Sequence, residues 1–517
     1  MIKHLTVKHF IFALVSFWII TLLTADRSFE TTHQFNLILA GIFLALYNPA
    51  DISKKQYFIM LGATAFAVLI SFVLPLKTWS SYLFFLLCGG YFILGFKKTA
   101  QQSLALLIIW CASFFNLCFI TNTHIGDVQY DFASCFNYIE YIMEDNFKFW
   151  QENPLLTRPS YSAYHPILHF FLTALAIRSG EWLSFSKDVA SEASQIVIVS
   201  YMLWYGLIVS RILNLFNLSR GIYFSTLAMV VFFPTYNAIS GFFNNDCLLL
   251  PLQAGIVYYS LTYLKDGCKK NLAYILLFAT LAALTKLSGV LILPLTAAVF
   301  LLRLLKQRNK QTFYEELICG ILLLIGISIW PLYQHFILNV DFSFVPPQTH
   351  LSLENYTLWQ RFNPLGAFVY EQMYYNDFGI NLWETMTKTA LFGQWDFTYR
   401  GTQIIPLITL LVYVYKTIIA VIIIAVIYLI FKAQNKKYFY LSLILLLSLL
   451  IGQILFGLKH PFMCNQDFRY IAVLPLAFAM ILGSFMQQIN SRLKNIVIGL
   501  LVIFALLSAF IWNWVSA

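Results

Sequence analysis

Charged residues are scarce in this chain of 517 residues: they make up 11% of it, while 60% of its residues are hydrophobic. Soluble domains carry about 25% charged residues, so this composition excludes an ordinary soluble fold. Short alternating strands are also absent. Many apolar runs are instead long enough for a helix to cross the ~30 Å hydrocarbon core. Because backbone polar groups in lipid must be satisfied within each helix, the sequence predicts an all-α polytopic membrane protein.

The chain also lacks paired cysteines. None of its eight cysteines forms a CxxC pair or a metal-like spacing, which favours small buried hydrophobic side chains over ligands. The net charge of +10 suits nucleic acid at first sight, but the placement of the basic residues along the chain explains it better. We expect no nucleic-acid partner.

The apolar runs predict a bundle of about 15 transmembrane helices. The first run follows Lys3 and Lys8 without a small-residue cleavage site, so we expect a retained span rather than a signal peptide. The predicted spans are roughly 9–24, 34–49, 56–76, 81–96, 102–121, 194–216, 221–240, 247–263, 271–284, 288–302, 317–336, 404–431, 438–457, 468–487 and 495–513.

The basic residues determine the expected orientation. With the N-terminus in the cytoplasm, every short inside loop is rich in lysine or arginine, as the positive-inside rule requires. These loops hold Lys54 and Lys55, Lys97 and Lys98, Arg211 and Arg220, Lys265 with Lys269 and Lys270, Arg303 to Lys310, Lys432 to Lys437, and Arg492 with Lys494. We therefore predict a multi-pass protein of the cell membrane (inner or plasma membrane) whose working surface is extracytoplasmic.

This topology divides the chain into five regions. They are an N-terminal five-helix membrane region (1–121), a first extracytoplasmic loop with interfacial helices (122–193), central transmembrane helices (194–336), a second extracytoplasmic segment (337–403) and C-terminal transmembrane helices (404–517). The apolar segment 165–178 is short for a span, so we expect a helix at the outer interface, anchored by Trp182. Aromatic residues of the second outer segment, Trp359, Trp383 and Trp395, are candidates to stack on sugars, although core packing is their commoner use.

Polar residues gather at the predicted outer ends of the spans. They are Asp127 and Asp131 in the first loop, His165 and His169 around the interfacial helix, Asn245 and Asp246 at a span start, Lys286 in a hairpin, and Asp467 with Arg469 before a late span. A carboxylate near an acceptor hydroxyl can act as a general base. Lysine and arginine stabilise a departing phosphate. The set therefore indicates group transfer from a lipid-phosphate donor whose polyprenyl tail lies between helices.

Simpler interpretations of these residues remain open. Asp246 can cap a helix, and Lys286 can extend its amine to the interface. Arg469 can bind lipid headgroups or pair with Asp467. His165 and His169 have the i, i+4 spacing of a metal pair, but no third ligand is evident, so we assign no metal site.

Five stretches carry a resemblance to a known family: YDFASCFNYIEYI (130–142), YHPILH (164–169), NNDCLLL (244–250), LTKLSGVLILP (284–294) and HPFMCNQDFRYI (460–471). In order and spacing they resemble the GT-C superfamily of integral-membrane glycosyltransferases. The likeness is to the family 39-like bacterial branch related to dolichyl-phosphate-mannose protein mannosyltransferases and the aminoarabinose lipid A transferase. The chain departs from that pattern at Cys135, where a His is frequent, and at Ile167, where a second Pro is usual.

The resemblance implies a GT-C-like bundle with two sizeable outer segments and an inverting transfer from a polyprenyl-phosphate sugar to a glycan, lipid or protein acceptor. It implies that Asp131 or Asp127 is the base, and Asp131 matches the family's catalytic Asp better, since the Tyr138–Ile139 pair follows at the family's distance. It also implies that Lys286 and Arg469 face the donor phosphate. No cofactor is required, and a divalent metal is an alternative source of positive charge.

Two rival functions remain. A transporter or flippase for lipid-linked sugars favours charges at mid-membrane, broken helices and symmetry between halves. The sequence has its charges at the ends of spans and no visible internal repeat, which favours the transferase. An oligosaccharide ligase or polymerase shares the large outer loops and differs mainly in its donor.

Overall fold

The computed structural model describes residues 100–122, 131–144, 153–157, 160–182, 184–241, 243–341, 351–368, 379–393 and 404–516. Within these ranges every extended regular element is a helix, and the pair Ser352 and Phe462 forms an isolated β-bridge. The predicted spans 9–24, 34–49, 56–76 and 81–96 lie outside the described residues.

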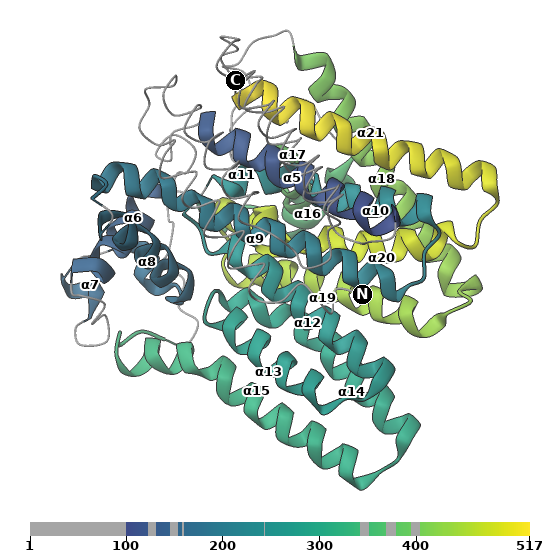
Figure 1. The fold of residues 1–517 in the computed structure, drawn as a ribbon, viewed down its shortest axis with the longest axis horizontal. Helices are drawn as coiled ribbons and strands as arrows, with labels where there is room; N and C mark the ends of the chain where they lie inside the picture. The colour runs from purple at the N-terminus through teal and green to yellow at the C-terminus, as the bar shows by residue number, and fades with distance from the viewer. Residues whose placement is uncertain are drawn as a thin grey trace, which may run out of the picture.

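The helices form a bundle, and α6, α7 and α8 lie together at its left side in the view of Figure 1. In the first half of the described chain they are α5 (Ala100–Asn122), α6 (Phe132–Glu144), α7 (Pro154–Thr157), η1 (Tyr161–Tyr164), α8 (Leu168–Trp182), α9 (Lys187–Leu215), α10 (Arg220–Val231), α11 (Pro234–Ser240), α12 (Asp246–Asp266) and α13 (Lys269–Ala283). They continue with η2 (Leu287–Ile292), α14 (Leu293–Gln307), α15 (Lys310–Phe336), α16 (Leu358–Phe362), η4 (Pro364–Ala367), α17 (Leu382–Phe392), α18 (Ile405–Lys432), α19 (Lys436–Lys459), η7 (Met463–Gln466), η8 (Phe468–Ile471), α20 (Leu474–Met486) and α21 (Ser491–Ser516).

Seven helices in the described ranges are long and apolar enough to cross a membrane, and a bent pair makes an eighth if it counts as one span. The seven are Arg220–Ser240, Asp246–Asp266, Leu287–Gln307, Lys310–Phe336, Ile405–Lys432, Lys436–Lys459 and Ser491–Trp512. The bent pair joins Met463–Ile471 to Leu474–Met486 at 51°. The prediction of an α-helical polytopic membrane protein is therefore confirmed, whereas the count of about 15 spans is not.

The helix α12 lies in the interior of the bundle and packs against α9, α13 and α14. Its apolar residues surround it on all sides, a pattern typical of a helix buried among other helices. Gly255 allows α13 to approach closely, because a Cβ at this position would lie 2.1 Å from the ring of Phe278. Gly267 ends α12 in a left-handed conformation with a φ of 68°, which glycine adopts without strain.

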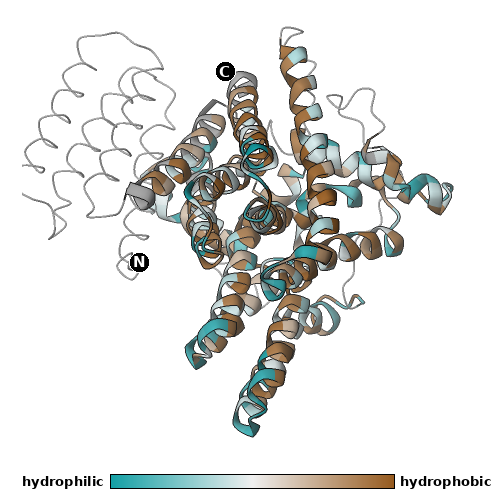
Figure 2. Ribbon diagram, turned by 90° about the vertical axis from the view of Figure 1, so that its right-hand side faces the viewer, coloured by the Kyte–Doolittle hydropathy of each residue, from teal (hydrophilic) through white to brown (hydrophobic). Residues whose placement is uncertain are grey.

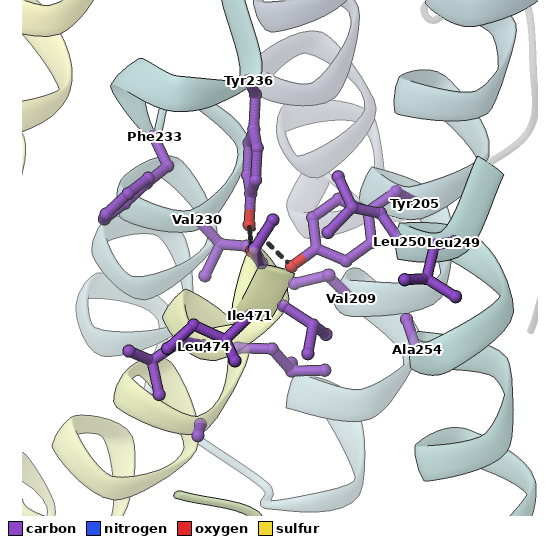
Figure 3. Close-up of a cluster of buried hydrophobic side chains, with 14 of the residues drawn as sticks. Tyr205, Val209, Val230, Phe233, Tyr236, Leu249, Leu250, Ala254, Ile471 and Leu474 are labelled. Carbon is purple, nitrogen blue, oxygen red and sulfur yellow. Dashed lines mark hydrogen bonds between the residues drawn. The ribbon is translucent and has the colours of Figure 1, made fainter. Parts of the chain in front are cut away.

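Two buried tyrosines fix the chain just before α20 (Figure 3). The Tyr236 hydroxyl donates a hydrogen bond to the carbonyl of Ala472 at 2.9 Å, and the Tyr205 hydroxyl lies 3.0 Å from that of Tyr236. Both rings are fully buried. This contact holds the bend that follows Arg469, so it positions a predicted site residue from within the core.

Two short helices lie within the segments that the sequence predicts to be outside the membrane. The helix α8, in the predicted interfacial stretch, spans 15 residues and is not among the candidate spans; Trp182 at its end is 75% exposed. The helix α17, in the second predicted outer segment, is instead buried and packs on α11 and η8. Part of this segment therefore belongs to the core of the bundle.

The three tryptophans of that segment fall in different settings. Trp359 is exposed and available to a ligand, whereas the indole N–H of Trp383 donates to the carbonyl of Phe362 at 2.9 Å. Trp395 lies outside the described residues.

The bundle has two chemically distinct ends. The helix α12 runs about 30 Å from Asp246 to Asp266, close to the thickness of the hydrocarbon core. Asp246 lies at the end that carries the predicted outer residues, and Lys265 lies in the last turn at the other. Figure 2 shows helices with hydrophobic shafts and hydrophilic ends, as expected for segments that end at the two membrane surfaces.

Candidate functional site

Asp131 occupies the residue before α6. Its carbonyl accepts the Cys135 N–H at 2.9 Å, which begins the helix and leaves the carboxylate at the helix entry. The opposite face of α6 carries buried Tyr138, Ile139 and Ile142 and packs on α8. The side chain of Asp131 is 55% exposed, so it is accessible to a ligand.

Arg469 lies between two carboxylates. Its Nη2 is 3.4 Å from Asp131 Oδ2, and its Nε is 3.4 Å from Asp467 Oδ2. The other Asp467 oxygen, Oδ1, accepts the backbone N–H of Arg469 at 3.0 Å and so caps the helix η8. Both guanidinium contacts are long for ionic hydrogen bonds. The buried Nη1 has no hydrogen-bond partner among the described residues, so the guanidinium retains donors for an anion.

Lys286 and Asp246 form a buried ion pair. Lys286 Nζ lies 2.5 Å from Asp246 Oδ1, and the two side chains are 9% and 1% exposed. Neither simpler interpretation describes this arrangement, since Lys286 is enclosed by protein and the N-cap of α12 is Asn245 rather than Asp246. Burial lowers the pKa of Lys286, while the charge of Asp246 opposes that shift. The pair therefore holds a cation in a place where an isolated ammonium would be unfavourable.

The neighbouring asparagines fix the backbone around this pair. Asn244 Oδ1 accepts the Asp246 N–H at 3.0 Å, and Asn245 Nδ2 donates to the carbonyl of Thr285 at 2.9 Å. Asn245 thus joins the start of α12 to the residue before Lys286. This predicted substrate-binding residue therefore links the chain beside Asp246 to the chain beside Lys286.

Tyr470 connects the two cations. Lys286 Nζ lies 4.4 Å from the centroid of its ring, and the guanidinium carbon of Arg469 lies 5.6 Å from the same centroid. Contacts of this kind stabilise a cation through the negative face of the ring. The tyrosine follows Arg469 directly in the chain, but nothing in the sequence indicated that Lys286 would meet it.

The two predicted histidines lie in different surroundings. His165 is exposed and lies within electrostatic range of Lys286, Asp246, Asp131 and Arg469. Desolvation by the surrounding protein, and then the charge of Lys286, lower its pKa, although part of the ring reaches solvent. We therefore expect a neutral imidazole near pH 7.

His169 is fully buried and packs against Phe170 and Tyr201. Neither of its ring nitrogens has a hydrogen-bond partner in the described part of the chain. His165, but not His169, lies within electrostatic range of the charged cluster. Asp127 lies outside the described residues.

A metal pair at the histidines has no structural support among the described residues, in which no group of three or more His, Cys, Asp or Glu side chains could hold a metal ion. Within the described part of this cluster, the cationic side chains are Lys286 and Arg469.

The helix α17 supports the site in a way that the sequence did not indicate. Thr389 Oγ1 accepts the N–H of Phe468 at 2.8 Å, and the carbonyl of Ile380, just before α17, accepts Gln466 Nε2 at 3.0 Å. These two hydrogen bonds flank Asp467. The polar composition of this segment suggested a surface location, and no local signal pairs Thr389 with a residue 79 positions away.

The fold and the cluster together define a multi-pass α-helical membrane protein with a charged site where several helices end. A scan against protein-family models finds no matching family, and a search of curated proteins finds no matching protein.

Proposed function

We propose that this protein is a glycosyltransferase of the cell membrane, similar to the GT-C superfamily, which transfers a sugar from a polyprenyl-phosphate donor to an acceptor on the extracytoplasmic face. One observation carries the proposal: Arg469 lies 3.4 Å from the exposed carboxylate of Asp131, while Tyr470 brings it beside Lys286. A candidate base and two cations thus meet in one place, although their chain positions are far apart.

Asp131 is the proposed general base. Its exposed carboxylate accepts the proton of the acceptor hydroxyl or amine as the acceptor atom attacks the anomeric carbon of the sugar. The bond between that carbon and the phosphate oxygen breaks from the opposite side, so the configuration inverts. Asp131 ends the step protonated, and polyprenyl phosphate leaves with the bonding electron pair.

Arg469 and Lys286 are the proposed stabilisers of the leaving phosphate. Arg469 has a buried Nη1 without a partner in the described residues, and Lys286 uses one short contact, to Asp246, of its three possible donors. Both cations are held by carboxylates and by Tyr470 before any ligand arrives. Such preorganised charge stabilises a developing anion without reorganisation during the reaction.

The roles of the remaining predicted residues follow from their positions. Asp467 orients Arg469, Asp246 orients Lys286, and His165 lies at the exposed side of the cluster, where it can bind the sugar or acceptor as a neutral donor or acceptor. The acceptor is a glycan, a lipid or a protein. Stabilisation of the leaving phosphate by Arg469 and Lys286 requires no cofactor.

The proposal is tested with purified protein, a panel of polyprenyl-phosphate sugars and the variant Asp131→Asn. Loss of a general base lowers the rate about 10²- to 10⁴-fold, whereas the exposed Asp188→Asn, in the first turn of α9, serves as the matched control and should keep full activity. Size-exclusion profiles and thermal midpoints of both variants verify folding. Full transfer by a folded Asp131→Asn protein would refute the role of Asp131.

A transporter for lipid-linked sugars is the second candidate, and one observation favours it. The span that begins with η7 and η8 is broken and bent by 51°, and Arg469 lies in its first half. Broken helices of this kind line ligand sites in transporters. The same transfer assay separates the two functions, because a transporter moves the donor across a vesicle without adding mass to an acceptor. A ligase or polymerase would add several sugars at once.

A further inference from the structure

Three cations converge at the end of the bundle opposite the proposed active site. Arg303 and Lys306 lie on the last turns of α14, and Lys437 lies on the first turn of α19, which packs against α14. Lys306 and Arg303 lie within electrostatic range of Lys437, and both carry a positive charge like its own. Three like charges close together are unfavourable unless an anion joins them.

Arg303 forms the fixed base of this basic cluster of Arg303, Lys306 and Lys437. It is buried, its Nη1 donates to the carbonyl of Tyr263 at 2.9 Å, and its guanidinium carbon lies 4.6 Å from the centroid of the Tyr263 ring. Gly267 makes room for it, since a Cβ there would lie 2.0 Å from Arg303 Nη2. The buried Nε has no hydrogen-bond partner among the described residues.

The carboxylates nearby have partners of their own. Glu315 forms an ion pair with Lys269 at 2.7 Å, and Glu316 accepts the Tyr263 hydroxyl at 3.0 Å. Across the described ranges, no salt bridge joins Lys306 or Lys437 to a carboxylate. The two lysines are therefore available to an anion supplied from outside the chain.

The surface beside the cluster indicates where that anion comes from. Leu302 and Leu305 of α14 and Tyr440 of α19 are exposed large hydrophobic residues, each within a few positions of a clustered cation. Cations next to an exposed apolar surface at a helix end suit a molecule with an acidic headgroup and acyl chains. Each lysine or arginine near an anionic membrane surface strengthens such binding by roughly 1 kcal/mol.

We propose that Arg303, Lys306 and Lys437 bind the phosphate of an anionic phospholipid in the leaflet opposite the active site. The lipid phosphate contacts both lysines and reaches towards Arg303, while its acyl chains lie along Leu302, Leu305 and Tyr440. This site is independent of the proposed transferase activity, because it shares no residue with the cluster around Asp131.

The test measures phosphatidylglycerol binding to the full-length protein by native mass spectrometry, with phosphatidylcholine as the neutral comparison. Wild type should retain one phosphatidylglycerol at concentrations where phosphatidylcholine is lost. The double variant Lys306→Gln/Lys437→Gln should bind it about 30-fold more weakly. The charge-keeping variant Lys306→Arg/Lys437→Arg should retain binding, which separates lost charge from damaged folding.

The matched control removes two cations of α21, the exposed Arg492 and the half-buried Lys494, in the variant Arg492→Gln/Lys494→Gln, and should bind like wild type. Equal loss in both glutamine variants would mean only general attraction to an acidic surface and would overturn the site. Equal binding of the two lipids by wild type would do the same. If inorganic phosphate displaces phosphatidylglycerol at equal concentration, the ligand is a soluble phosphate rather than a lipid.

Discussion

The buried pair of Lys286 and Asp246 permits a sharp test of the site that does not depend on knowing the substrate. The variant Asp246→Leu removes the counter-charge of the Lys286 ammonium group, whose side chain is 9% exposed. The variant Lys286→Met likewise removes the counter-charge of the Asp246 carboxylate, whose side chain is 1% exposed. Removing one partner of a buried pair costs about 3–5 kcal/mol. Replacing both by apolar residues of similar size is frequently neutral, so the double variant should recover most of each loss.

The assay is equilibrium unfolding in mixed detergent micelles, followed by circular dichroism, for wild type, both single variants and the double variant. The coupling free energy is the difference between the loss in the double variant and the sum of the single losses. We expect about 3 kcal/mol or more of coupling, since the charged atoms lie 2.5 Å apart. A double variant that loses the sum of both single effects would refute the buried pair.

The same double variant also separates stability from function. If Lys286 stabilises a leaving phosphate, the stable double variant should remain inactive in sugar transfer. Full transfer by that protein would remove Lys286 from the proposed mechanism while leaving the structural pair intact.

Two further predictions concern packing and pH. Gly255→Ala should destabilise the protein by about 1–3 kcal/mol, because the new Cβ would overlap the Phe278 ring. In Gly320→Ala the new Cβ meets no atom within 4 Å, so this variant should stabilise α15 by about 0.5–1 kcal/mol. If both variants change the free energy of unfolding equally, the close packing of Gly255 on Phe278 is wrong. Burial lowers the pKa of Lys286, so sugar transfer should fall on the alkaline side at a lower pH than for a free lysine. Lys286→Arg stays charged and should move this loss to higher pH, and identical alkaline limbs in the pH–rate profiles would argue against the role.

The sequence indicated which of these polar residues stand near the ends of helices. Asp131, Asp246, Lys286 and Arg469 each stand at the start or end of an apolar run, and helix geometry converts such a position into a place near one end of the bundle. The structure brings these four together. His169 also stands near the end of an apolar run, but its side chain is buried among aromatic rings. Residues at the same level of a helix can point in different directions, so the level alone does not place a side chain in the cluster.

The pairing of those residues could not be predicted. Lys286 meets Asp246 across 40 positions and Arg469 meets Asp131 across 338, separations at which the pattern of the chain carries no distance information. The burial of α17 could not be predicted for a related reason. Its threonines and lysine are polar, yet the structure buries them in a helix that packs on η8.

The sequence by itself determined the class of protein, an α-helical polytopic membrane protein, because the cost of placing backbone and charge in hydrocarbon acts on each segment separately. Only the tertiary structure decided which charges face each other, because that choice depends on how helices distant in the chain pack. The contact of Tyr470 with both Lys286 and Arg469 is the clearest example: one residue between two cations, visible only once α12, η2 and η8 share a site.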